Sequence, residues 1–587
     1  MPYLDEESFV NDVTKIFGER SMEDVKFNRI KLEKRLDFAI IGILLLILRF
    51  AHLSMLRNYD NDSSEPVFTD DEKYLLENPI GIEVTNVAQL CLNQFRLLRR
   101  STLCIFQCAL YMRLYHSYAP EDGDGLDGGD SQIFTGMLIQ MGISIGLNRD
   151  PGNLDSFDDG KLVNLWRKIW YCLIGADNYQ CYALGNPQMT RKEFFDTKLP
   201  EFEIKSSNIK DYELEKNVID IIREREKVHT LTSNLTDLVS NIRDPPTVMI
   251  ILKKISETEN FIKENYGHLR NILTPTNHNH IDNIKKVKKI CSYCDLITLL
   301  HPIYYHLFLH YEIKGNSELC REIIKSILKI IMNVVANFVD LIKNSHKYVG
   351  HGFDLILTPT LETTMHKTLQ FQFALYLRCH NYRKELIDKS EGKNEEEIKH
   401  NKIVVERITK FATNLYSNIE KYVKGLNVIN HKYYYAWRMS KAQSIILTML
   451  KEKDSLFYDI NESIKKTSKY SNEKIPKFSI FINSTPEYFD ELINVINPDS
   501  YLQKFLSSSS SENSSINGKN SDSSNTKVDT QELDNFWVDL LTKSTNNMLD
   551  PNANIGFASG NTFAPVNSAT TAAMVANDYR TFVKEAL

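Results

Sequence analysis

The sequence predicts an all-α protein made of long helices. Apolar residues recur at a spacing of three to four along most of the 587 residues, whereas the alternating Val- and Thr-rich runs typical of strands are nearly absent. The composition, 42 % hydrophobic and 25 % charged, is that of a globular protein able to bury one large core or two smaller ones. We therefore expect a large multi-helix domain with a disordered Ser-rich segment near the C-terminus.

The expected helices are separated by loops that carry turn-forming and charged residues, such as NDNDSSEPVFTDDE, APEDGDGLDGGD and TPTNHNH. The apolar spacing places helices at residues 6–17, 22–57, 82–118, 131–147, 161–183, 212–242, 246–266, 281–313, 317–345, 360–386, 395–424 and 432–452. The expected domains are a helical domain at 1–455, a connecting segment with short helices at 456–506, a low-complexity linker at 507–528 and a tail at 529–587.

The most apolar segment is FAIIGILLLIL at residues 38–48, which Asp37 precedes and Arg49 follows. It is about half as long as the roughly 20 apolar residues that a membrane-spanning helix needs. Extending it to Leu56 brings Arg49 and His52 near its middle, where charges are costly unless they are paired. The acidic opening MPYLDEESFVNDV is unlike a signal peptide. We therefore expect a buried core helix and no membrane partner.

Net charge and cysteine content argue against two classes of protein. The formal net charge of −6 disfavours nucleic-acid binding by this chain alone, because affinity for phosphates needs clustered positive charge. The nine cysteines are scattered and odd in number, which is typical of reduced thiols in a nuclear or cytosolic protein and not of a disulfide framework.

Motifs for catalysis or metal binding are weak. The acidic loop 121–130 lacks the ligand spacing and final Glu of an EF-hand. CSYC at 291–294 is a lone CxxC, whereas a structural zinc site needs a second pair. His306 and His310 are four apart, but Leu307 stands where a zinc protease has Glu. Because nucleophile and phosphate-binding motifs are also lacking, we expect no enzyme and no metal in this chain.

The most informative stretch is residues 140–200. In GLNRDP, Asn148 can cap the end of a helix, and Asp150 leaves the helical region because it precedes Pro151. A second helix then follows, and GNP at 185–187 ends it.

The second helix carries an apolar stripe formed by Leu162, Trp166, Ile169, Trp170 and Leu173. Asp177 continues this stripe, and a carboxylate there costs free energy unless it is paired. We expect Arg149 to be its partner, so that Arg149→Ala destabilises the protein by about 3–5 kcal/mol. Arg167 and Lys168 are expected on the opposite side of the helix.

The order GL-x-R-D-P, LWRKIW, D, GNP and LP resembles the middle homology region of fungal zinc-cluster transcription factors, whose pattern is roughly GLHRD, RRRLWW, Asp, GRP and LP. This chain departs from the pattern at Asn148, Tyr171 and Asn186, and its basic run is shorter. The resemblance implies a structural role for the motif residues Gly146, Leu147, Arg149, Asp150, Pro151, Trp166, Arg167, Trp170, Asp177, Gly185, Pro187, Leu199 and Pro200.

The resemblance has one gap, since the family binds DNA through an N-terminal cluster of six cysteines that holds two zinc ions. Here the first cysteine is Cys91, and no CxxC–x6–C array occurs. The resemblance therefore implies no cofactor in this chain, with zinc, DNA contact and homodimerisation belonging to a missing part. We expect a longer protein whose DNA-binding module precedes this chain, because an activation-like tail is present. Loss of the module is the alternative.

The resemblance implies a nuclear regulatory domain that restrains an activation segment, and several members of the family sense small molecules. A hydrophobic ligand would bind between helices. The ligand-pocket candidates are Ile41, Leu45, Leu48, His52, Tyr305 and Phe308. The alternative for each of these residues is ordinary core packing.

The C-terminal part is low in complexity at 507–527 and then becomes amphipathic at 529–545. The activation-segment candidates, placed among acidic residues, are Phe536, Trp537, Leu540 and Leu541. Such a segment can fold into the groove of a coactivator. The alternative is a terminal helix that packs back onto the core.

The expected function is therefore regulation and activation of RNA polymerase II genes by a ligand-responsive factor. A helical scaffold subunit of a chromatin or kinetochore DNA-binding complex is the alternative. An all-α enzyme is disfavoured, because paired carboxylates, metal-ligand spacings and an activated nucleophile are missing from the sequence.

Overall fold

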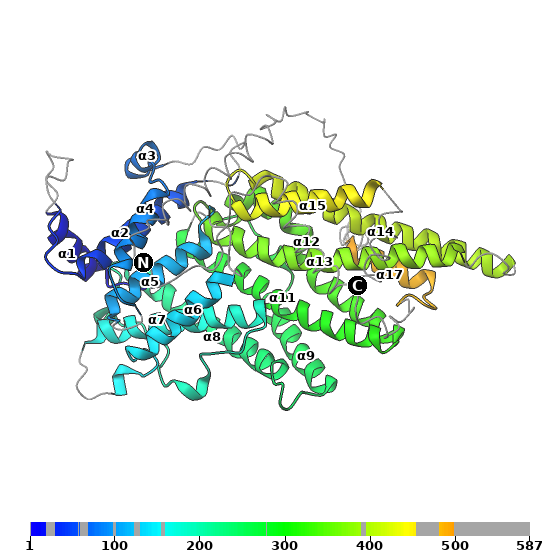
Figure 1. The fold of residues 1–587 in the computed structure, drawn as a ribbon, viewed down its shortest axis with the longest axis horizontal. Coiled ribbons are helices and arrows are strands. Elements are labelled where there is room, and N and C mark those ends of the chain that lie inside the picture. The colour runs from blue at the N-terminus through cyan, green and yellow to red at the C-terminus, as the bar shows by residue number, and fades with distance from the viewer. Residues whose placement is uncertain are drawn as a thin grey trace, which may run out of the picture. The chain divides into compact units, whose positions relative to one another are not determined.

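The computed structural model describes residues 2–18, 30–56, 58, 68–97, 101–121, 129–153, 159–276, 279–388, 395–452 and 480–497. Every regular element in these residues is helical, and none is a strand, which confirms the all-α prediction (Figure 1). The chain forms two compact units. Unit 1 is Met1–Ile303 with Asn337–Lys367, and unit 2 is Tyr304–Ala336 with Thr368–Leu587.

The α-helices are α1 Glu6–Phe17, α2 Asp37–Met55, α3 Asp70–Glu77, α4 Glu83–Asn93, α5 Leu103–Tyr118, α6 Gly129–Ser144, α7 Gly160–Leu184, α8 Tyr212–Val239, α9 Val248–Asn265, α10 Leu269–Ile272, α11 His280–Ile313, α12 Ser317–Val349, α13 Asp354–Asp388, α14 Glu395–Ile429, α15 Tyr434–Glu452 and α17 Pro486–Ile496. Three 3-10 turns, η1 to η3, lie at Pro151–Asn153, Lys192–Phe194 and Ile204–Ser206.

Two expected helices differ in extent from the structure. The helix expected at 22–57 begins at Asp37, whose carboxylate accepts hydrogen bonds from the backbone amides of Glu33 at 2.7 Å and Lys34 at 2.8 Å. These bonds stabilise a turn before the helix, in place of a further helical turn. The helix expected at 82–118 is two helices, α4 and α5, separated by a short break.

Two helices that lie outside the helix ranges given above begin at recognisable caps. Before α3, Thr69 accepts a hydrogen bond from the Glu72 amide at 3.3 Å, and the Glu72 carboxylate accepts one from the Thr69 amide at 2.8 Å. This is a capping box, which satisfies two free amides at once. Before α17, the side chain of Thr485 caps the helix, and Pro486 takes its first position, where no amide is needed.

The apolar run lies in α2, which packs against α4 and α5 in the core of unit 1. Ile43 and Leu46 are almost completely buried. Gly42 marks the close approach, because a Cβ atom there would lie 2.8 Å from Cys108 Sγ and 3.5 Å from the carbonyl oxygen of Ala88. α2 is therefore shaped to fit its neighbouring helices.

The charges beside the run have partners inside unit 1. Arg49 Nη2 lies 2.6 Å from Glu121 Oε1, and both side chains are about nine-tenths buried. Tyr115 also donates a hydrogen bond to this carboxylate at 2.5 Å. Within the described residues, α2 is the one helix long and apolar enough to cross a membrane, and 44 % of its most apolar window is buried inside the protein.

Substitution of Gly42 by Val is expected to lower the free energy of unfolding by about 1–3 kcal/mol, because the added methyl groups overpack the contact with α4 and α5. Thermal unfolding followed by circular dichroism measures the loss. Gly136→Ala in α6 is a matched control, since a Cβ there meets its nearest atom at an ordinary 3.7 Å. Equal stability of Gly42→Val and wild type would contradict the close packing.

In unit 2, α14 packs against α15 and α17. Phe411 of α14 and Phe489 of α17 have ring centroids 6.4 Å apart. Lys325 of α12 forms an ion pair with Glu491 of α17 at 2.6 Å. Residues 480–497 are thus an integral part of unit 2.

Candidate functional site

The two ends of the family motif lie side by side next to α7 in unit 1. The Thr197 hydroxyl donates a hydrogen bond to the carbonyl oxygen of Leu147 at 2.7 Å, and the Asp196 amide donates one to that of Asn148 at 3.0 Å. We call this pair of segments the motif bracket, residues 146–151 and 194–200. The bracket joins the end of α6 to the segment that leads into α8.

Gly146 and Trp166 fix the first segment of the bracket against α7. Gly146 has φ +90°, a conformation that favours glycine, and its carbonyl oxygen accepts a hydrogen bond from Trp166 Nε1 at 3.3 Å. Leu147 and Pro151 are buried, as is Trp170, which meets Phe195 edge to face. These contacts hold the first segment of the bracket against α7.

Asp150 is the electrostatic centre of the bracket. Its buried carboxylate accepts hydrogen bonds from Arg167 Nε at 2.9 Å and Nη2 at 2.8 Å, and from the backbone amides of Gly152 at 2.9 Å and Lys198 at 2.7 Å. Burial alone raises the pKa of Asp150, but these donors outweigh it and hold the pKa below its ordinary value. Asp150 is therefore ionised at neutral pH and ties both segments to α7.

The predicted pair between Arg149 and Asp177 is wrong. Arg149 points outward, with 70 % of its side chain exposed, and forms an ion pair with Asp196 at 3.0 Å. Because Arg149 lies in a turn that faces solvent, the bracket satisfies it locally.

Asp177 is buried, as its place on the apolar stripe predicted, but it holds a loop and not a cation. Its Oδ2 atom accepts hydrogen bonds from the amides of Met189 at 2.9 Å and Thr190 at 2.7 Å, and from the Thr190 hydroxyl at 2.7 Å. Gly185 ends α7 with φ +79°, so the chain turns back through Pro187 toward Asp177. Burial raises the pKa of Asp177, although these hydrogen bonds oppose the shift.

Arg149→Ala is now expected to lower the free energy of unfolding by less than about 1 kcal/mol, because exposed ion pairs contribute little. Arg167→Ala, which leaves the buried Asp150 carboxylate without its cation, is the matched comparison and should cost several times more. Urea unfolding of both variants measures the contrast, and a similar loss in the two would contradict the assignment of partners.

Lys168 also differs from expectation, because it is fully buried and does not lie on a polar side of the helix. Its ammonium lies 2.7 Å from Glu215 Oε1 of α8, and both side chains are 0 % exposed. Asn164 donates to the same oxygen at 3.1 Å. Burial lowers the pKa of Lys168, while Glu215 opposes the shift. This ion pair links α7 to α8 inside unit 1.

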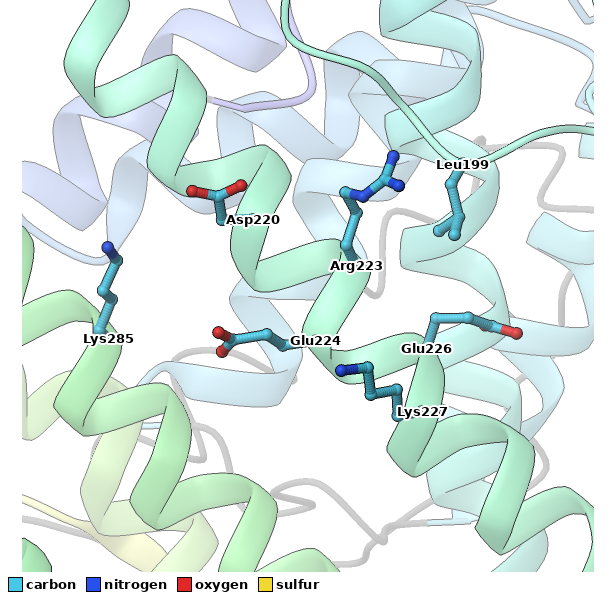
Figure 2. Close-up of a pocket in the computed structure, with 7 residues that line it drawn as sticks. All are labelled: Leu199, Asp220, Arg223, Glu224, Glu226, Lys227 and Lys285. Carbon is cyan, nitrogen blue, oxygen red and sulfur yellow. The ribbon is translucent and has the colours of Figure 1, made fainter. Parts of the chain in front are cut away.

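A charged groove lies on the surface of α8. Figure 2 shows the residues that line it. Leu199 lies in the segment before α8, Lys285 lies on α11, and the other five lie on α8: Asp220, Arg223, Glu224, Glu226 and Lys227. The volume of the groove is about 460 Å³. Three acidic side chains, three basic side chains and one leucine line the groove. It therefore suits a polar or charged partner rather than a hydrophobic ligand.

The predicted ligand-pocket residues are not brought together by this groove, and their role stays a prediction. Ile41 and Leu45 pack on the core of unit 1, and Leu48 is partly buried. His52 is buried, and burial lowers its pKa. In unit 2, the ring centroids of Tyr305 and Phe308 are 6.1 Å apart.

The described part of the chain offers little support for a metal site or a reactive thiol. No group of three His, Cys, Asp or Glu side chains there is arranged to hold a metal ion. Cys291 and Cys294 are buried in α11, and burial raises the pKa of both thiols. The activation-segment candidates and most of the acidic loop 121–130 lie outside the described residues.

Comparison with known proteins agrees with the motif. The family model "Fungal specific transcription factor domain" matches residues 54–309. The "Multidrug resistance regulator 1" of Candida albicans is 31 % identical over 572 residues, covering 92 % of this chain and 51 % of that protein.

Two further relatives are from Saccharomyces cerevisiae. The "Oleate-activated transcription factor 1" is 23 % identical over 150 residues, 25 % of this chain and 14 % of that protein. The "Heme-responsive zinc finger transcription factor HAP1" is 22 % identical over 559 residues, 65 % of this chain and 38 % of that protein. No solved structure matches.

The chain spans about half the length of the Candida relative, and less of the others. The relatives are transcription regulators and not enzymes, as the sequence predicted. With the motif bracket, the all-α fold and the family match in agreement, residues 54–309 of this chain form a fungal-specific transcription factor domain.

Proposed function

We propose that this chain is the regulatory and activation region of a nuclear transcription factor that acts on RNA polymerase II genes. The observation that carries the proposal is the 31 % identity with a fungal multidrug resistance regulator over 92 % of the chain. In this proposal DNA is contacted by a homodimer, through a cysteine cluster with two zinc ions that lies outside this chain.

The proposed signal is a hydrophobic small molecule. The names of three relatives mention drug resistance, oleate and heme, and these names refer to those proteins. A ligand of this kind would act here by binding the restrained and the active state with different affinity. The two helical units, each with its own core, supply the apolar interior that such a ligand needs.

The proposed output is a coactivator contact made by the tail. Its support is the apolar face at Phe536, Trp537, Leu540 and Leu541 within an acidic sequence. The test fuses the whole chain to a foreign DNA-binding domain and measures a reporter gene in yeast. We expect transcription from wild type and at least a several-fold loss when all four residues are Ala.

A matched variant with Asp534, Asp539 and Glu532 replaced by Asn and Gln tests whether the acidic setting contributes. Equal amounts of each fusion on the promoter, measured by chromatin immunoprecipitation, make the outputs comparable. Promoter binding without transcription in wild type would overturn the activator proposal. The comparisons do not favour the alternative of a structural scaffold subunit, since the relatives are regulators.

A further inference from the structure

Four helices of unit 1 bring polar and ionisable side chains together in its interior. Arg225 of α8 lies 3.2 Å from Asp295 of α11. Burial opposes ionisation of Arg225, but Asp295, Tyr182 of α7 and Tyr118 of α5 outweigh it and raise the pKa of the guanidinium. We call this group the interior charged cluster, which comprises Tyr118, Cys172, Tyr182, Arg225, His229, Lys288, Cys291 and Asp295.

The cluster has more cations than carboxylates. Burial lowers the pKa of the Lys288 ammonium, and the described residues that act on it besides are Cys291, Arg225, Cys172 and Asp295. Burial raises the pKa of both thiols, so they carry no compensating charge at neutral pH. Two cations therefore face one carboxylate. Arg225 takes that carboxylate, and Lys288 forms no ion pair with any described residue.

The cluster is also incompletely packed. Tyr118, Cys172 and Lys288 lie deep among the helices, yet each keeps some accessible surface. The Arg225 side chain is likewise 26 % exposed. Protein interiors are normally close-packed. Accessible surface at this depth therefore indicates free space beside these side chains.

His229, one turn from Arg225 on α8, is a second sign of an unfilled site. It is 7 % exposed, and neither ring nitrogen has a hydrogen-bond partner. Burial lowers its pKa to about 3, so the ring is neutral at physiological pH and offers one N–H donor and one acceptor. A buried polar group left in this state costs free energy unless something bonds to it.

We propose that the interior charged cluster binds the carboxylate of an apolar monocarboxylic acid, with Lys288 as its counter-ion. This deepens the proposed function and rests on it, because it names the class of small molecule. The carboxylate gives Lys288 the ion pair it lacks and brings the cluster to two cations and two anions. In this proposal the hydrocarbon chain packs against Leu114 and Ile222, which lie about one helical turn before Tyr118 and Arg225 and are partly buried against the core of unit 1.

The experiment measures binding of decanoate, decanol and decylammonium to the purified chain by thermal shift and calorimetry. A ligand that binds the folded state raises the melting temperature in a concentration-dependent way. We expect decanoate to bind about 10- to 100-fold more tightly than decanol, which is the contribution of a charge-assisted hydrogen bond. Decylammonium should bind most weakly.

Lys288→Met should abolish the preference for decanoate and leave binding of decanol unchanged. Asp295→Asn, which removes the competing carboxylate, should strengthen decanoate binding, and it keeps the test open should the first variant fail to fold. Lys285→Met is the matched control: it lies on the same helix but lines the surface groove, and it should bind decanoate as wild type does.

Equal affinity for decanoate and decanol in wild type would overturn this inference, as would loss of decanoate binding in Lys285→Met. Neither result bears on the proposed function, which the reporter assay with the fused chain and its tail variants tests separately. If the fused wild-type chain gives no transcription while the purified chain binds decanoate through Lys288, the proposed function is overturned and the binding site is retained.

Discussion

Glu215→Ala is expected to lower the free energy of unfolding by about 3–5 kcal/mol, because it leaves the Lys168 ammonium buried without a counter-ion. The carboxylate also accepts a hydrogen bond from Asn164, which loses its partner in the variant. Since the pair joins α7 to α8, we expect the whole of unit 1 to be destabilised. Urea unfolding followed by circular dichroism measures the effect.

Two comparisons isolate the buried charge. Lys168→Met combined with Glu215→Gln removes both charges and keeps an acceptor for Asn164, so it should restore most of the lost stability. Glu7→Ala breaks the exposed pair of Glu7 with Lys161 on the same helix and should cost less than about 1 kcal/mol. A double variant as unstable as Glu215→Ala would contradict this account.

Asp150→Ala is expected to cost a similar amount, about 3–5 kcal/mol, because Arg167 and two backbone amides lose a buried acceptor together. The segment 194–200 should then detach from 146–151. Faster amide hydrogen exchange at Lys198, together with a lower melting temperature, measures both consequences. Unchanged exchange at Lys198 would mean that other contacts hold the bracket.

The Asp150 carboxylate also predicts a pH dependence. Its pKa is lower in the folded state than in the unfolded state, so its contribution is fully present above the unfolded value of about 3.9 and is lost as the pH falls through the folded value. Asp150→Asn should therefore lose less stability than wild type between pH 5 and pH 2. Parallel pH profiles for the two proteins would show that Asp150 is not responsible.

The helices were largely predictable because their signal is local. α1 has the predicted bounds, and α7, α8 and α11 agree with prediction within a few residues, since each shows the apolar spacing over many turns. α3 was missed because it has few apolar residues, although its capping box was readable. The segment between α4 and α5 contains no Gly or Pro, so the apolar spacing predicted one continuous helix across it.

The partners of charged residues were not predictable in the same way. Lys168 forms an ion pair with Glu215, which is 47 positions away in the sequence. Asp150 accepts a hydrogen bond from the amide of Lys198, which is 48 positions away. No local pattern links such residues, because the fold alone brings α7, α8 and the bracket together. Burial of Asp177 was predictable from its place on the apolar stripe, whereas its backbone partners depended on the turn after Gly185.

The most direct test of the central claim compares two readouts across one panel of neutral and charged apolar compounds. The first is the melting temperature of the purified chain, and the second is the reporter output of the same chain fused to a foreign DNA-binding domain. We predict that the compounds which stabilise the chain are the ones that change transcription, in the same rank order. Compounds that change the reporter output without shifting the melting temperature, or the reverse, would contradict a ligand-responsive regulatory region.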